Sequence, residues 1–296
     1  ELFRNNYKKA GQLEKLKNPV QLDVELNGGC NMKCPFCLHG YGDKRPNTLF
    51  PIERYKTLID EAVAFGIRGL KLNYINEPML RKDLEQCIAY AKSAGMLNVY
   101  MVTNGTLLNA KRRASMLNSG ITKVFISLDA ATSQTYNKQR LSGKFDLVVK
   151  NILNFVEERN RQGGKYPLVR VSFLRNALNI HEEEAFREFW HDKVDMLAFQ
   201  KMNDLPDLDS GLTLKKQNLE KESCSFPFKQ LVVDYQGDIL PCCKMGGKKL
   251  ALGNIKNMTL EKAWNSKEMQ SLQLMHKENR WRENPVCRRC ITNNGG

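Results

Sequence analysis

Six strand-like segments that alternate with helical patterns are the feature that most constrains the fold of this chain. They are rich in β-branched and large apolar residues, as buried parallel strands are. The segments span residues 21–26, 69–74, 99–103, 123–128, 168–173 and 196–200. Because parallel strands in one sheet are joined by right-handed crossovers, the series predicts an α/β fold with a parallel sheet.

The stretches between these segments have apolar residues at helical spacing. One such face is formed by Tyr55, Leu58, Ile59, Ala62 and Phe65. Similar faces recur within 84–91, 148–159 and 185–190. Eight β–α units would close a full barrel, so six predict a partial (β/α)6 barrel that is open on one side. Its functional residues are expected at the C-terminal ends of the strands.

The sequence changes character after the sixth segment. Residues 205–211 are rich in turn-forming and acidic residues, which favours a domain boundary there. Beyond this stretch, residues 230–235 and 238–240 predict a β-hairpin, and a helical pattern follows. We therefore predict an N-terminal extension (1–20), a barrel (21–205) and a small C-terminal domain of a hairpin and helices (206–296).

The net charge of +14 comes from 46 basic and 32 acidic residues. The basic residues are scattered, and their short clusters lack the interleaved aromatic residues of nucleic-acid-binding surfaces. We therefore expect solvated helix faces and no nucleic-acid partner. There is no run of eighteen apolar residues to span a membrane, and the first residues lack the apolar core of a signal peptide.

Seven of the nine cysteines stand in tight groups, which is the arrangement of metal ligands rather than of disulfides. The groups are Cys30, Cys34 and Cys37, then Cys242 and Cys243, then Cys287 and Cys290. Reduced thiols of this kind predict a cytoplasmic location.

The first group follows the first predicted strand as a CxxxCxxC loop, Cys30, Cys34 and Cys37. Three thiols cannot close a tetrahedral metal site, which needs four ligands. They can hold three corners of an iron–sulfur cube and leave one iron open to a ligand that is not protein. The alternative, a zinc knuckle, uses paired CxxC units, and this loop has the wrong number of cysteines.

At this loop the chain resembles the radical SAM superfamily, whose CxxxCxxC motif follows the first strand of a partial (β/α)6 barrel. The resemblance implies a [4Fe–4S] cluster whose open iron is chelated by S-adenosylmethionine (SAM). In that family the reduced cluster cleaves SAM to a 5′-deoxyadenosyl radical, which abstracts a hydrogen atom from the substrate. The resemblance also implies an electron donor such as flavodoxin or ferredoxin.

Three further residues of the first half match positions of the family. Phe36 lies between the last two cysteines, at the aromatic position beside the adenine of SAM. Glu77 and Pro78 match the end of the family's GGEP element, and the Glu77 carboxylate would contact the SAM amino group. Residues 74–76 depart from the glycines of that element.

The ends of the next two predicted strands extend the resemblance. Asn104 belongs to a TNG match, and Ser127 begins a match to S-(L/I/V)-D with an implied SAM contact. Arg140 is placed like the arginine that reaches the SAM carboxylate in many members. A surface arginine is the alternative for this residue.

Four further cysteines predict a second site in the C-terminal domain: Cys224, Cys242, Cys287 and Cys290. Four thiols can close a tetrahedral set, and by spacing alone structural zinc fits as well as a cluster. Their spacing around a strand–glycine turn–strand unit resembles Twitch, the shortened SPASM domain, which implies one auxiliary [4Fe–4S] cluster. The spacing is similar to that of 2-deoxy-scyllo-inosamine dehydrogenases, radical SAM enzymes that oxidise an aminocyclitol.

Two cysteines remain. Cys87 lies on the apolar face of a predicted helix, which indicates a core residue. Cys243 is adjacent to a predicted cluster ligand, and three roles are open to it. It could replace Cys242 as the ligand, be an inert neighbour, or donate a hydrogen atom in an epimerase.

The expected function is that of a radical SAM oxidoreductase that dehydrogenates a carbinol of an aminocyclitol or sugar, with the auxiliary cluster as electron acceptor. One alternative is a sugar or cyclitol epimerase in which Cys243 returns hydrogen. Another is a peptide maturase; many of those enzymes carry an N-terminal leader-recognition domain, and the about twenty residues before the first strand count against this alternative without excluding it. A non-enzymatic iron–sulfur or zinc scaffold would leave the open three-thiol site unexplained.

Overall fold

The computed structural model describes residues 2–40, 45–141, 144–202, 211–214 and 223–293. Within these residues one mixed sheet has the strand order β6-β5-β4-β3-β2-β1-β7-β8-β9. The strands are β1 (Gln21–Val24), β2 (Gly69–Lys71), β3 (Asn98–Thr103), β4 (Lys123–Ser127), β5 (Leu168–Arg175), β6 (Met196–Lys201), β7 (Gln230–Val233), β8 (Asp238–Leu240) and β9 (Gly253–Asn254). Pairing is parallel from β6 through β1 to β7, and antiparallel from β7 to β9.

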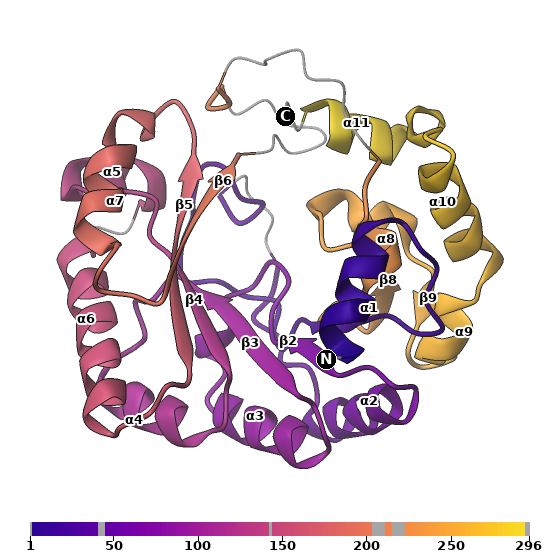
Figure 1. Ribbon diagram of the computed structural model, residues 1–296, viewed down its shortest axis with the longest axis horizontal. Coiled ribbons are helices and arrows are strands. Elements are labelled where there is room, and N and C mark those ends of the chain that lie inside the picture. Colours follow the sequence, from indigo (N-terminus) through magenta and orange to yellow (C-terminus); the bar gives the residue numbers. More distant parts are fainter. Residues whose placement is uncertain (1, 41–44, 142–143, 203–210, 215–222, 294–296) are drawn as a thin grey trace.

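Helices from the first two thirds of the chain form a layer outside the curved sheet (Figure 1). Those in this layer are α2 (Ile52–Ala64), α3 (Leu84–Ser93), α4 (Ala110–Asn118), α5 (Ser133–Arg140), α6 (Phe145–Arg161) and α7 (Glu183–Trp190). The remaining helices are α1 (Leu2–Gly11), α8 (Phe226–Lys229), α9 (Leu260–Trp264), α10 (Lys267–Lys277) and α11 (Pro285–Asn293). α1 packs on α8, where Ala10, Val20 and Phe228 are buried together.

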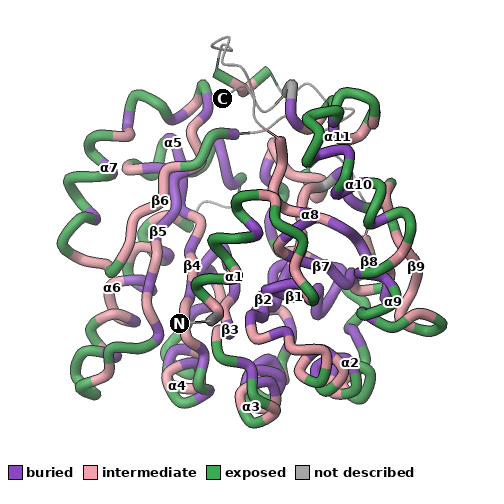
Figure 2. Tube along the Cα trace, turned by 45° about the vertical axis from the view of Figure 1, so that its right-hand side comes forward, coloured by how far each residue is buried: buried purple, intermediate pink, exposed green. Residues whose placement is uncertain are grey.

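The two faces of the parallel strands differ in polarity, because successive side chains point to opposite sides of a sheet. The outward face is apolar and packs on the helices through residues such as Leu22, Leu70, Val99, Val124 and Val171, which are fully buried. In Figure 2 the residues of β3 to β5 are buried or intermediate, and the surrounding helices are exposed on their outer side. The inward face carries polar side chains, among them Asp23, Lys71, Tyr100, Lys123 and Arg170.

The predicted fold class is confirmed, and all six predicted strands and the hairpin are present. Several elements lay outside the prediction: α1, α4, α5, α8, α10, α11 and the short β9. Two of these helices, α4 and α5, are polar, and they have few apolar residues to reveal a helical period. The predicted boundary between residues 205 and 206 lies outside the described residues and stays a prediction.

The C-terminal hairpin continues the barrel sheet. Strand β7 lies parallel to β1, with Gln21 opposite Gln230 and Val24 opposite Val233. Backbone hydrogen bonds extend this pairing at both ends, since Val20 and Glu25 donate to carbonyl groups beside and within β7 at 2.8 Å. The cysteine loop that follows β1 and the cysteines that follow β8 are therefore held by strands of one sheet, with β7 between them.

None of the helices in the described part of the chain combines the length and the apolar character that crossing a membrane requires.

Truncation of the central strand should destabilise the whole sheet. Leu22 is fully buried in β1, so Leu22→Ala should lower the free energy of unfolding by about 2–5 kcal/mol through lost burial and the cavity left behind. Leu97→Ala, at a position that is 61% exposed, should change it by less than about 0.5 kcal/mol. Urea unfolding followed by circular dichroism measures both, and equal losses would contradict the central role of β1.

Candidate active site and a second cysteine site

A cleft of about 220 Å³ lies at the C-terminal ends of the barrel strands. The loop after β1 forms one wall, and the ends of β2 to β6 form the rest. All eight residues predicted for the first site line it: Cys30, Cys34, Phe36, Cys37, Glu77, Asn104, Ser127 and Arg140. The structure thus brings together side chains that are up to about a hundred residues apart in the sequence.

Side-chain amides fix the start of the cysteine loop. Asn27 donates to the Gly29 carbonyl at 3.1 Å and to Asn47 Oδ1 at 3.0 Å. Asn76 donates to Asn27 Oδ1 at 2.7 Å, and the Glu77 N–H donates to the Gly29 carbonyl at 3.0 Å. The segment after β2 therefore holds the cysteine loop in place. The hydrogen bond from the Asn76 side chain explains why an asparagine can stand at a position where the family has glycine.

The three thiols of the loop lie in a desolvated setting. Burial raises the pKa of Cys30 to about 12, and it raises the pKa values of Cys34 and Cys37 as well. Thiolates, the form that binds iron, need positive charge nearby in such a setting, and the iron itself supplies it. In the described residues no three His, Cys, Asp or Glu side chains are gathered around a point for a single metal ion. This donor set fits a cluster, because each thiol then binds a separate iron.

Glu77 presents a buried carboxylate to the cleft and is 2% exposed. It caps the short 3-10 helix at Pro78–Leu80 by accepting from the Met79 N–H at 3.1 Å. Its oxygens also accept from the Thr103 hydroxyl at 2.7 Å and the Asn104 N–H at 2.8 Å. Burial raises the pKa of Glu77, and these hydrogen bonds oppose the rise. A fixed carboxylate of this kind fits an ammonium ligand, as the SAM amino group would be.

Asn104 lines the cleft, but its side-chain amide forms hydrogen bonds with other residues of the protein. Its Nδ2 donates to Asn31 Oδ1 at 2.7 Å, and its Oδ1 accepts from the Thr106 hydroxyl at 2.6 Å. Asn31 closes the ring by donating to Thr106 Oγ1 at 2.9 Å. The end of β3 thereby anchors the cysteine loop, and the Asn104 backbone N–H holds Glu77.

Arg140 is a buried arginine, 7% exposed, so the surface alternative does not describe it. Its guanidinium pairs with Asp129 and donates to Cys34 Sγ at 3.7 Å. The guanidinium carbon lies 5.6 Å from the centre of the Phe36 ring. Burial would lower the pKa of Arg140, and the Asp129 carboxylate more than offsets this. Asp129 adopts a left-handed backbone (φ 62°), which asparagine and aspartate tolerate best among residues with a side chain.

Ser172 on β5 was missed by the sequence analysis. It lines the cleft, is 4% exposed, and its hydroxyl has no hydrogen-bond partner among the described residues. The Nε atom of Arg140 is likewise buried without a partner. Two unsatisfied polar groups at one cleft fit a polar ligand such as SAM, because a buried polar atom normally has a partner. The available signal was a polar serine on the same face of the predicted strand as Arg170, among apolar residues that point to the other face.

The second cysteine set surrounds a separate small cavity of about 30 Å³. The cavity is lined by Cys224, Cys242, Cys287 and Cys290 and by apolar side chains that include Leu250, Leu272 and Ile291. Cys287 and Cys290 are three residues apart on α11, so they share a helical face. Burial raises the pKa of Cys224 to about 11 and that of Cys287 to about 12. All four predicted auxiliary cysteines are therefore brought together in an apolar shell.

His276 is a residue of this second site that the sequence analysis passed over. It lines the cavity, and its Nδ1 accepts a hydrogen bond from the Cys224 N–H at 3.3 Å. Burial lowers the pKa of His276 to about 4, so the ring is neutral at physiological pH. The sequence around His276 gives no indication of this role, because a lone histidine on a helix is as often a core residue as part of a site.

Cys243 faces away from this cavity. The charged groups near its thiol are Lys71 and Asp23, on the inward face of the barrel strands, and the neighbouring Lys244; burial raises the pKa of the Cys243 thiol. Cys242 lines the cavity with the other three cysteines. Of these two adjacent residues, only Cys242 lines the cavity, so the structure groups Cys242 and not Cys243 with the other three cysteines.

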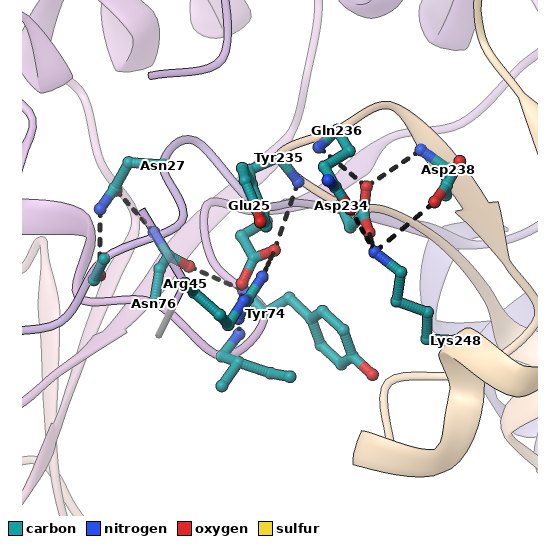
Figure 3. A network of polar contacts seen from close by, with 12 residues as sticks. Glu25, Asn27, Arg45, Tyr74, Asn76, Asp234, Tyr235, Gln236, Asp238 and Lys248 are labelled. Carbon is teal, nitrogen blue, oxygen red and sulfur yellow. Dashed lines mark hydrogen bonds and ion pairs between the residues drawn. The ribbon is translucent and has the colours of Figure 1, made fainter. Parts of the chain in front are cut away.

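A buried glutamate connects the two sites (Figure 3). Glu25 follows β1 and accepts from Arg45 at 2.5 Å, from the Ile75 N–H at 3.0 Å and from the Tyr235 N–H at 3.3 Å. Next to it, the Tyr74 hydroxyl donates to the Lys244 carbonyl at 2.6 Å, two residues after Cys242. The cysteine loop, the end of β2 and the C-terminal hairpin are thus held by one polar network.

The sequence matches two family profiles. Residues 24–187 match the radical SAM superfamily, and residues 224–291 match SPASM, an iron–sulfur cluster-binding domain. The first match covers more than half of the chain, and the chain therefore belongs to the radical SAM superfamily. The predicted cofactors, SAM with its [4Fe–4S] cluster and an auxiliary iron–sulfur cluster, are confirmed by these families. The zinc and scaffold alternatives are set aside.

Curated relatives share part of the chain. A protein of Saccharolobus solfataricus named as a probable GTP 3′,8-cyclase is 32% identical over 59% of this chain and 54% of its own length. Fe-coproporphyrin III synthase of Methanosarcina barkeri is 30% identical over 64% of this chain and 45% of its own. The chain thus spans about half the length of these two relatives.

Solved structures share the fold over nearly the whole chain. BtrN in complex with AdoMet and 2-DOIA has a TM-score of 0.60 at 21% identity, with coverage of 90% of this chain and 91% of BtrN. SuiB of Streptococcus suis bound to S-adenosylmethionine has a TM-score of 0.72 at 14% identity, with coverage of 91% and 71%.

Close packing inside the cysteine loop makes Gly40 a sensitive position. A Cβ atom there would overlap the Cys34 carbonyl oxygen, so Gly40→Ala should displace Cys34. The iron content should then fall from about eight per chain, the content of two [4Fe–4S] clusters, to about four. Gly164→Ala, whose Cβ would meet its nearest atom at 3.4 Å, should keep all of them. Iron and sulfide analysis after anaerobic reconstitution measures both, and a full complement in Gly40→Ala would refute this packing.

The neighbouring cysteines 242 and 243 form a matched pair of variants. Cys242→Ser should lower the iron content from about eight to about four per chain, because Cys242 lines the four-cysteine cavity. Cys243→Ser should retain about eight, because its thiol faces the barrel. Electron paramagnetic resonance of the reduced proteins identifies which cluster is lost. The reverse pattern would exchange the roles of the two residues.

Proposed function

We propose that this radical SAM enzyme dehydrogenates a carbinol of an aminocyclitol or sugar and uses the auxiliary cluster as electron acceptor. The observation that carries the proposal is the pairing of two thiol sites: an open three-cysteine cleft and a separate four-cysteine cavity. The likeness to BtrN supports it, because it covers about nine tenths of both chains and BtrN was solved in complex with AdoMet and 2-DOIA. Longer relatives with cyclase and synthase names match about half of their length.

In this proposal Cys30, Cys34 and Cys37 hold the first cluster, and Glu77 receives the SAM ammonium group. Arg140 would bind the SAM carboxylate, Ser127 would contact SAM, and Phe36 would lie beside the adenine. When bound, SAM and the reduced cluster supply a 5′-deoxyadenosyl radical that removes a hydrogen atom from the substrate. The carbinol loses in total one hydrogen atom, one proton and one electron, which leaves a ketone.

The second set, Cys224, Cys242, Cys287 and Cys290, would hold the auxiliary cluster that takes this electron. We further propose that the two functions belong to residues 21–205 and 206–296, after an extension of residues 1–20. The matched family ranges, 24–187 and 224–291, support this division. An external donor such as flavodoxin or ferredoxin would supply the electron that starts each turnover.

A radical epimerase is the second candidate, and the position of Cys243 favours it. The thiol faces Lys71 and Asp23 on the inner side of the barrel rather than the auxiliary cavity. A thiol on that side could return a hydrogen atom to a substrate radical. In this alternative the substrate carbon is inverted and no net oxidation occurs.

Cleavage of SAM tests the shared first step. With dithionite and SAM, the reconstituted enzyme should form 5′-deoxyadenosine, and Cys30→Ala should form at least about a hundredfold less because one corner of the cube is lost. Cys87→Ala serves as the control, since Cys87 is buried in the core away from both sites. Product formation is measured by chromatography, and an active Cys30→Ala variant would sink the proposal.

The fate of the substrate separates the two candidates. In D2O, trial aminocyclitols such as 2-deoxy-scyllo-inosamine and related sugars should yield a product that has lost two hydrogens and gained no deuterium. An epimerase would instead give an inverted product with one solvent deuterium, and Cys243→Ser would abolish it. Mass spectrometry and NMR distinguish these outcomes, and a modified peptide as the only product would refute both.

A further inference from the structure

Uncompensated positive charge lines the inside of the barrel beneath the cleft. Lys123 begins β4 and Arg170 lies in the middle of β5. Because side chains alternate along a strand, they share the inward face with Ser127 and Ser172, which line the cleft. Arg170 precedes Ser172 by two residues, about 7 Å along the strand. Arg170 is thus a short step below the cleft, whereas Lys123 lies at the start of β4, about 13 Å along the strand from Ser127.

Other charges on the inner side of the sheet are paired. Lys71 lies 2.5 Å from Asp23, Arg45 pairs with Glu25, and Arg140 pairs with Asp129. Neither Lys123 nor Arg170 forms an ion pair or a hydrogen bond with a carboxylate anywhere in the described part of the chain. This contrast makes the lower part of the barrel interior an electropositive surface.

Arg170 is held in one orientation. Its guanidinium carbon lies 3.5 Å from the centre of the Phe125 ring, and Phe125 in turn packs on Tyr100 at 5.2 Å between ring centres. Stacking leaves the edge of the guanidinium with its N–H donors available. The Nε atom is buried and has no hydrogen-bond partner within the described residues. A buried donor without a partner is unfavourable unless a ligand satisfies it.

Lys123 lies close to other positive charges. Burial lowers its pKa, and the charges of Arg170 and of Arg4 on α1 lower it further. Like charges that are gathered and partly desolvated destabilise the free protein, and a bound anion would remove that cost. Arg4 is exposed, so the group is open to solvent on the α1 side.

We infer that Arg170 and Lys123, with the Ser172 hydroxyl above them, bind a compact anionic group of the substrate, a carboxylate or a phosphate. The anion would fix one end of the substrate in the barrel and direct the rest toward the cleft. This inference rests on the proposed function. Within the proposed substrate class it selects acidic sugars, such as a uronate or a sugar phosphate, over cationic aminocyclitols.

The test compares four sugars of one size: glucose, glucosamine, glucuronate and glucose 6-phosphate. Calorimetric titration of the reconstituted enzyme with SAM should show that at least one anionic sugar binds about tenfold or more tightly than glucose and glucosamine. Which anionic sugar binds more tightly identifies the group as carboxylate or phosphate. Glucosamine or glucose binding as tightly as both anions, or no binding by either anion, would overturn the inference.

Variants locate the effect. Arg170→Gln and Lys123→Gln should each reduce the preference for the anionic sugar about tenfold, whereas Arg170→Lys should retain part of it. Arg187→Gln is the matched control, because Arg187 also stacks on a ring, 4.1 Å from the centre of Phe199, but lies on the outer helix α7. A preference that survives both glutamine variants would refute the site.

Folding is checked by the melting temperature of each variant. If Arg170→Gln does not fold, the half-buried Lys123 decides the question alone. Binding requires no turnover, so failure of the proposed function is separable from failure of this inference. Absence of 5′-deoxyadenosine formation would contradict the proposed function, and absence of a preference for anionic sugars would contradict the inference of an anion site.

Discussion

Strand β1 is hydrogen-bonded on both edges, and both cysteine sites depend on this arrangement. On one edge it pairs with β2, whose end carries the Glu77 segment, and on the other with β7 of the C-terminal hairpin. The three-cysteine loop leaves from its C-terminal end. The position of one cysteine site relative to the other is therefore fixed through β1, which both sites share as a support. A rigid sheet is a suitable support, because a site built on paired strands is held more firmly than one built on loops.

Buried carboxylates organise the space above this strand. Glu25 joins the loop, the end of β2 and the hairpin, and Glu77 joins the end of β2 to that of β3. Asp129 does the same for β4 and β5 by accepting from the Leu174 N–H at 2.8 Å, and it pairs with Arg140. Each buried charge has an ionic partner or several N–H donors, as buried charges require. The strand ends are thereby kept in a fixed arrangement around the cleft.

Much of the fold was predictable because its signal is local. Alternation of apolar strands with helical faces identified all six barrel strands, and the cysteine spacing identified the two metal sites. Helices α4 and α5 escaped prediction, because they are polar and have little periodicity. Arg140, at the end of α5, could be a surface residue or a ligand by its sequence, and only its packing on Phe36 and Asp129 distinguished these possibilities.

The sequence by itself determined the family, the parallel sheet and the identity of the clustered thiols, since these follow from residue type and short spacing. Only the tertiary structure decided which side chains meet. It showed that Cys242 and not Cys243 lines the second cavity. It also placed the Ser172 hydroxyl, which has no hydrogen-bond partner among the described residues, at the cleft, and it showed that Arg170 inside the barrel has no ionic partner there. The physical reason is that the side of a strand to which a side chain points follows from its own position in that strand. Which side chains from different strands meet depends on the register between strands that are far apart in the sequence.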